Sequence, residues 1–128
     1  MKANLWSSIL VGSSLLLLSQ AASAGFLASV VGTWNVRANQ SVGTMNITFQ
    51  SATGACRKIS GDILGLPMVG FYCPATGRIQ FLRNNLVRTT FQVYSANLSF
   101  TSASTNYMSG SFSSFDTSLG EYSFYASK

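Results

Sequence analysis

The sequence contains no histidine and only three acidic residues, Asp62, Asp116 and Glu121, among its 128 residues. General acid–base catalysis needs a positioned histidine, carboxylate, lysine, tyrosine or cysteine with a suitable pKa. Protein metal sites are built mainly from histidine, cysteine and carboxylate ligands. Asp116 and Glu121 flank a predicted turn, where carboxylates commonly cap the backbone. This scarcity argues against an enzyme, and the chain offers no candidate catalytic residue, no metal ligands and no implied cofactor.

Long apolar runs are also missing, except near the amino terminus. Lys2, an interrupted apolar stretch and the small residues Ala22-Ser23-Ala24 form the pattern of a cleavable signal peptide. The apolar stretch spans only about ten residues, too few to cross a bilayer as a helix. We therefore predict a signal peptide at residues 1–24, cleaved after Ala24, and a single domain at residues 25–128. The processed protein is expected to be secreted or periplasmic, with no membrane span.

Cysteine is scarce as well, since Cys56 and Cys73 are the only two in the chain. Oxidising compartments favour disulfides, so export predicts a disulfide between them. The basic residues give a formal net charge of +5. They are scattered along the sequence, whereas a nucleic-acid surface gathers them on one face. The charge pattern therefore does not indicate a nucleic-acid partner.

What the sequence does contain is alternation of apolar and polar residues with a period of two. In residues 44–50, for example, Met45, Ile47 and Phe49 alternate with polar side chains. Turn-forming residues recur every eight to twelve positions, a spacing typical of all-β sandwiches and barrels. Eight strands are predicted, at residues 32–38, 44–51, 55–63, 68–73, 78–83, 90–98, 107–115 and 121–127. Short connections favour an eight-stranded antiparallel up-and-down β-barrel, whose closure removes exposed sheet edges.

The cysteines fix a register for the third and fourth strands. A tight two-residue turn at Leu64-Gly65 places Cys56 directly opposite Cys73 in the ladder. The same register directs Val69 and Phe71 outward, away from a face formed by Ile59, Gly61, Ile63, Met68, Gly70 and Tyr72. Outward apolar side chains often mark association, so Val69 and Phe71 are candidate subunit-interface residues of a homo-oligomer. The alternative is a bulge or a different loop length that turns both inward.

Several short motifs resemble the avidin and lipocalin (calycin) barrels. Gly32-Thr33-Trp34 resembles their Gly-x-Trp opening, and residues 59–63 resemble the aliphatic-Thr-Gly strand of streptavidin-type avidins. Met68 to Tyr72 lies where their fourth strand would be, and Gly77 to Asn85 aligns without gaps on their fifth. The resemblance implies a small secreted β-barrel of the avidin or lipocalin type.

The biotin-binding residues of avidins are not matched. Leu82 replaces the tryptophan at the end of the fifth strand, and the seventh strand offers Met108 and Phe112 in place of another tryptophan. The aspartate that binds the biotin ureido group has no clear counterpart, while Asn35 is placed to serve the polar first-strand role. The resemblance therefore implies the barrel and does not carry over biotin binding.

Binding pockets combine an apolar lining with a few placed polar groups. On that basis the candidate ligand-binding residues are Trp34, Asn35, Gln40, Ser41, Tyr72 and Phe81. In the alternative interpretation Trp34 closes the bottom of the core. The aromatic residues are then packed core, a group that comprises Phe49, Tyr72, Phe81, Phe91, Phe112, Tyr122 and Phe124.

The leading hypothesis is a secreted, non-catalytic barrel that binds a small apolar or amphipathic ligand. The alternative is a barrel with a solid core that acts through protein–protein contact, either as a protease-inhibitor-like protein or as a self-associating envelope component. An outer-membrane barrel ranks below both, because such barrels carry a lipid-facing apolar band and longer loops.

Overall fold

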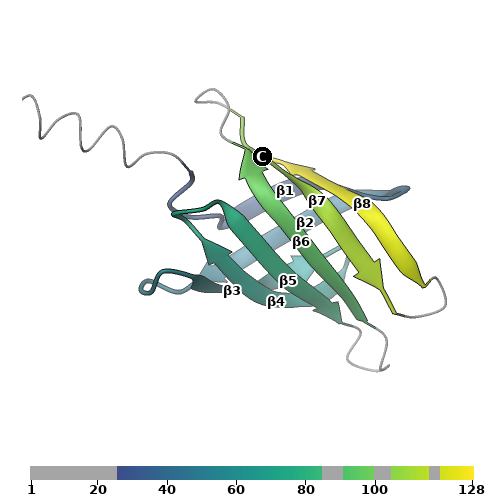
Figure 1. The fold of residues 1–128 in the computed structure, drawn as a ribbon, viewed down its shortest axis with the longest axis horizontal. Coiled ribbons are helices and arrows are strands. Elements are labelled where there is room, and N and C mark those ends of the chain that lie inside the picture. Colours follow the sequence, from purple (N-terminus) through teal and green to yellow (C-terminus); the bar gives the residue numbers. More distant parts are fainter. Residues whose placement is uncertain (1–25, 85–90, 100–104, 116–118) are drawn as a thin grey trace, which may run out of the picture.

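A computed structural model describes residues 26–84, 91–99, 105–115 and 119–128, and the predicted signal peptide lies outside these ranges. The described chain is all-β and contains eight strands (Figure 1). They are β1 (Gly32–Ala38), β2 (Ser41–Gln50), β3 (Arg57–Ile63), β4 (Leu66–Cys73), β5 (Arg78–Asn84), β6 (Phe91–Ser99), β7 (Tyr107–Ser114) and β8 (Gly120–Ser127).

Each strand pairs antiparallel with the next, and β1 pairs with β8 to close the barrel. The closing ladder runs from Asn35 opposite Ser127 to Ala38 opposite Phe124. The predicted eight-stranded meander barrel is therefore confirmed. β2 begins at Ser41 and β4 at Leu66, each earlier than predicted, because each follows a tight turn.

The strands alternate between a buried inner face and an outer face, as a barrel wall requires. On β1, Trp34, Val36 and Ala38 point inward and are buried, while the residues between them are exposed. Apolar side chains from all eight strands join in one core. Alternation in the sequence thus translates directly into an inside and an outside.

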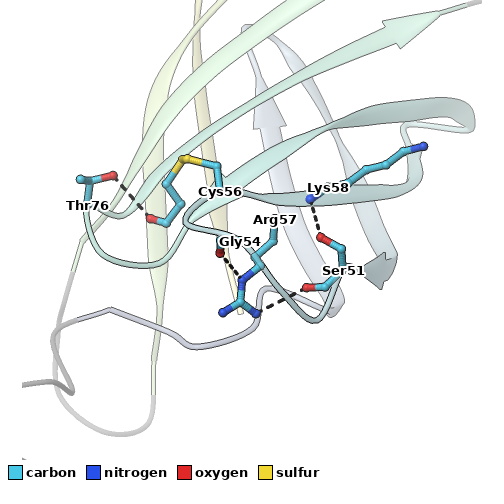
Figure 2. The surroundings of a disulfide bond; sticks show 7 residues. Ser51, Gly54, Cys56, Arg57, Lys58 and Thr76 are labelled. Atoms are coloured by element: carbon cyan, nitrogen blue, oxygen red, sulfur yellow. Dashed lines mark hydrogen bonds between the residues drawn. A yellow bond between two sulfur atoms is a disulfide. The ribbon is translucent and has the colours of Figure 1, made fainter.

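The hairpin of β3 and β4 has the predicted register. Arg57 pairs with Tyr72 and Ile63 with Leu66, so the turn is the two-residue Leu64-Gly65. Both turn residues have positive φ, 49° and 80°, as a type I′ hairpin turn requires. Cys56 and Cys73 form the predicted disulfide just beyond the paired residues, at the opposite end of the hairpin (Figure 2).

Two aromatic residues lie outside the core, so their predicted inward placement is wrong. Phe49 is 43% exposed because the β2–β3 ladder shifts register between Ile47 and Phe49. This β-bulge adds a residue to β2 and reverses the direction of the side chains that follow it. Phe91 is also exposed. The inward side chains of β6 are those of Tyr94, Ala96 and Leu98, so the odd-numbered residues of this strand, Phe91 among them, face outward.

Glycines allow neighbouring strands to approach closely at three places in the wall. A Cβ atom at Gly61, Gly70 or Gly110 would lie within about 2 Å of a carbonyl oxygen on the adjacent strand. The three glycines are on β3, β4 and β7, so the close approaches are spread around the barrel. Glycine is required there by space and not by turn formation.

Candidate functional site

A group of aromatic rings packs inside the barrel. Tyr94 stacks on Phe81 with ring centroids 4.7 Å apart and on Phe112 at 4.8 Å. Phe124 meets Phe81 and Tyr94 edge-on at 5.9 and 5.1 Å. Burying such rings contributes strongly to stability, and their offset and edge-on contacts add to it. The centre of the barrel is therefore occupied by the protein's own side chains.

One end of the barrel is closed by the segment that precedes β1. The buried Trp34 indole donates from Nε1 to the Val30 carbonyl at 2.9 Å, and Tyr72 Oη donates to the Leu27 carbonyl at 2.5 Å. Gln50 bonds the same segment twice, accepting from Val30 N and donating to the Ala28 carbonyl. Burial raises the pKa of Tyr72 to about 12.

The carboxyl terminus reinforces this closed end. Lys128 Nζ donates to the Val31 carbonyl at 2.7 Å and lies 5.4 Å from the centroid of the Trp34 ring. An ammonium group over an aromatic face is attracted to it. Partial burial lowers the pKa of Lys128. Trp34 is thus held between the two ends of the domain, as the core interpretation of this residue predicts.

The six candidate ligand-binding residues do not gather on one surface. Trp34, Tyr72 and Phe81 are buried in the core. Asn35, Gln40 and Ser41 are exposed to solvent. Asn35 is on the outer face of β1, and Gln40 and Ser41 are at the turn that joins β1 to β2. Sequence alternation separates the two groups because adjacent residues of a strand point to opposite faces.

Asn35 contributes to a shallow depression of about 180 Å³ on the outside of β1, β2 and β8. It is bounded by Asn35, Val36, Arg37, Val42, Tyr125 and Ser127. Typical small-molecule pockets enclose roughly 300–1,000 Å³ and bury most of the ligand. The depression is smaller than this range and lies on the outer wall.

The side chain of Arg83 lies at the other end of the barrel. Arg83 on β5 donates from Nε to the Ile63 carbonyl at 2.9 Å and from Nη2 to the Leu64 carbonyl at 3.0 Å. Its Nη1 donates to Gln92 Oε1 at 3.3 Å, which also accepts from Tyr94 Oη at 2.8 Å. Burial raises the pKa of Tyr94 to about 12, although the positive charge of Arg83 acts in the opposite direction.

The described carboxylates do not reach this mouth of the barrel as partners of Arg83. Asp62 accepts a hydrogen bond from Asn46 Nδ2, and Glu121 accepts one from Ser111 Oγ. Asp116 lies outside the described residues. Within the described ranges, no three histidine, cysteine, aspartate or glutamate side chains gather closely enough to hold a metal ion.

The largest departure from the inside–outside pattern is on the outer face of β4, β5 and β6. Val69 lies opposite Leu82, which in turn lies opposite Val93, so three apolar side chains form a row across the strands. The exposed fractions of Val69, Phe71 and Val93 are 44, 38 and 37%. We call this surface the apolar wall, and it comprises Pro67, Val69, Phe71, Leu82, Phe91 and Val93.

The apolar wall continues toward the mouth of the barrel. The Phe91 ring contacts the Phe115 ring with centroids 5.1 Å apart, and Phe115 is also exposed. Beside Phe71 the outward side chains are Gln80 and Ser95, and the Ser95 hydroxyl accepts a hydrogen bond from Arg78 Nη2. The predicted outward direction of Val69 and Phe71 is confirmed, and a register without a bulge in this hairpin explains it.

Comparison with models of known protein families, with curated proteins and with solved structures found no match for this chain. The barrel is compatible with an avidin-like or lipocalin-like fold. Among the described residues, no helix has the length and apolarity needed to cross a membrane. The disulfide is compatible with an extracellular or periplasmic location.

Proposed function

We propose that this chain is an exported, non-catalytic association protein that acts through the apolar wall of a solid-core barrel. The single observation that carries the proposal is the outer-face row Val69–Leu82–Val93, in which two exposed valines flank a half-buried leucine across three paired strands. Contiguous exposed apolar surface on a protein outside a membrane marks an interaction site. The signal-peptide pattern at residues 1–24 and the Cys56–Cys73 disulfide support the export part of the proposal.

The aromatic rings packed in the interior support this proposal over a ligand held inside the barrel. A small eight-stranded barrel is only wide enough for side chains or for one small ligand. Tyr94, Phe81 and Phe112 stack through the middle of this one. Removing them to admit a ligand would cost the stability that buried rings contribute.

The experiment is sedimentation velocity on the exported protein, purified without denaturation from the compartment that receives it. Leu82→Lys places a charge at the centre of the row, and Ser123→Lys places the same charge on the outer face of β8 as a matched control. We expect wild type and Ser123→Lys to sediment as species larger than one chain, and Leu82→Lys as a single chain. Single-chain sedimentation of wild type, or an unchanged profile for Leu82→Lys, would overturn the proposal.

A second candidate function is supported by the mouth of the barrel. Arginine has five N–H donors, and the described acceptors use one each from Nε, Nη1 and Nη2 of Arg83. A carboxylate above the mouth would accept the others, so the ligand class is a small amphipathic carboxylate. Calorimetric titration with octanoate should show heat of binding that Arg83→Met abolishes and Arg37→Met retains. Equal heats from the two variants would rule this out.

A further inference from the structure

Strand β3 borders the apolar wall and carries one charge of each sign on its outer face. Lys58 lies opposite Phe71, Ser60 opposite Val69, and Asp62 opposite Pro67. Ser60 therefore extends the row of Val69 and Leu82, and the two charges lie at equal distances along the strand on either side of it. Figure 2 shows the Lys58 side chain extending away from the disulfide.

This placement has a consequence for a second copy of the chain. When two sheets pack face to face about 10 Å apart, a two-fold axis between them lies parallel to both faces. If the axis runs along the row from Ser60 to Val93, each strand faces its own counterpart in the opposite direction. Val69 and Leu82 then lie on the axis and face the same residues of the second copy. Residues on one side of the row face residues of the second copy that lie on the other side of its row.

We propose that the apolar wall binds a second copy of this chain about such an axis. Lys58 of each copy then faces Asp62 of the other, and Phe71 of each faces Pro67 of the other. The interface is self-complementary, because each charged residue faces one of opposite sign and each apolar residue faces an apolar one, as two-fold contacts require. The inference rests on the proposed function, because it specifies the occupant of the same surface.

Charge distinguishes this arrangement from the other simple one. An axis parallel to the strands, centred on β5, would place Lys58 opposite Ser111 of the second copy, because the row of Lys58 continues through Phe71, Gln80 and Ser95 to Ser111. Lys58 would then gain no acidic partner. The axis along the row pairs both β3 charges across the interface and keeps them out of its centre, where two positively charged chains would otherwise repel.

The test is a charge reversal at the two positions, measured by sedimentation equilibrium on the purified chain. Lys58→Asp alone opposes two acids across the interface, and Asp62→Lys alone opposes two bases. We expect each single variant to self-associate at least fivefold more weakly than wild type. An equimolar mixture of the two should recover wild-type association, because every facing pair is then opposite in charge. The double variant should also associate like wild type.

Controls separate this inference from the proposed function. Arg37→Asp, on the exposed outer face of β1, changes charge away from the wall and should leave association unchanged. Circular dichroism of each variant verifies folding. If Leu82→Lys abolishes association while the mixture is no stronger than its components, the surface is right and the two-fold arrangement is wrong. If wild type does not associate at all, both proposals fail.

Discussion

On β4 to β6 the outward side chains include Val69, Phe71, Leu82, Phe91 and Val93, whereas on β7 and β8 they include Ser109, Ser111, Ser113 and Ser123. We call the second surface the serine wall. The two walls lie next to each other, with β7 and β8 drawn in yellow-green and yellow in Figure 1. Both cover the same interior, because Phe81 and Tyr94 point inward on one side and Phe112 and Phe124 on the other.

The comparison shows which features the fold itself requires. Both walls need inward apolar residues and a close-approach glycine, Gly70 on β4 and Gly110 on β7. Neither wall needs outward apolar residues, since serine supports an equally regular ladder on β7 and β8. An antiparallel sheet with one solvated face is normally polar outside. We therefore attribute the apolar side chains on β4 to β6 to the proposed contact with another surface.

The largest expected effect tests what the two walls share. Gly70→Ala would place a Cβ 2.0 Å from the Gln80 carbonyl oxygen, and Gly110→Ala one at 2.0 Å from that of Ser95. Because backbone must shift to relieve such contacts, each change should lower the free energy of unfolding by about 3 kcal/mol. Urea unfolding measures this, with the exposed Ser109→Ala as control. A loss below about 1 kcal/mol for either glycine would contradict the close approach.

The next effect concerns the disulfide, which lies at the apolar-wall side of the barrel. Replacing both Cys56 and Cys73 by serine removes a cross-link over a sequence separation of 17. We expect the free energy of unfolding to fall by roughly 3 kcal/mol, because the unfolded chain regains entropy. Hydrogen exchange should show the amides at the Cys73 end of β4 losing protection before those of β7. Equal unfolding midpoints for oxidised wild type and the variant would contradict this.

A smaller effect is expected at alkaline pH, and its origin is the interior behind the apolar wall. Burial raises the pKa values of Tyr72 and Tyr94 from the ordinary 10.0 to about 12. The folded state then keeps protons that the unfolded state has lost. Stability should be fully present below pH 10 and should fall between pH 10 and about 12.

Denaturant unfolding at several pH values measures this fall. The double variant Tyr72→Phe, Tyr94→Phe cannot ionise at these positions, so its stability should decline less steeply across the same interval. Phe81→Leu, a core change without a titrating group, serves as the control. An identical decline in wild type and the double tyrosine variant would show that other groups cause the alkaline loss.

The smallest effect on stability should come from replacing outward apolar residues by serine in the apolar wall, and outward serines by valine in the serine wall. Leu82→Ser with Val93→Ser makes the apolar wall resemble the serine wall, and we expect the free energy of unfolding to change by no more than about 1 kcal/mol. Ser111→Val with Ser123→Val, at two positions that pair across β7 and β8, should instead create a second association surface. Urea unfolding and light scattering measure the two outcomes. A large loss in the free energy of unfolding on replacing Leu82 and Val93 would indicate that these residues belong to the core.

Much of the fold could be predicted from the sequence because its signals are local. Alternation identified eight strands, and one assumed turn at Leu64-Gly65 was enough to place Cys56 opposite Cys73 and to direct Val69 outward. Phe49 was misplaced because nothing in its alternation marks the bulge that precedes it. Phe91 was misplaced because Phe91 and Val93 flank the polar Gln92, an alternation that favours the odd-numbered residues as the inward ones.

The candidate site was less accessible to sequence reasoning. The row exists because Leu82 lies opposite Val93. The sequence between β5 and β6 does not reveal which residues of the two strands pair, so this register could not be predicted. Arg83 was missed for a related reason, since its acceptors belong to the turn between β3 and β4. The one usable signal was an arginine at an inward position of an alternating strand.

Native mass spectrometry of the exported protein tests the central claim most directly, because one spectrum reports both the number of chains and any retained small molecule. We expect a dimer with no added mass, which dissociates to single chains when Leu82 is replaced by lysine. A single chain that carries a bound small molecule would contradict it.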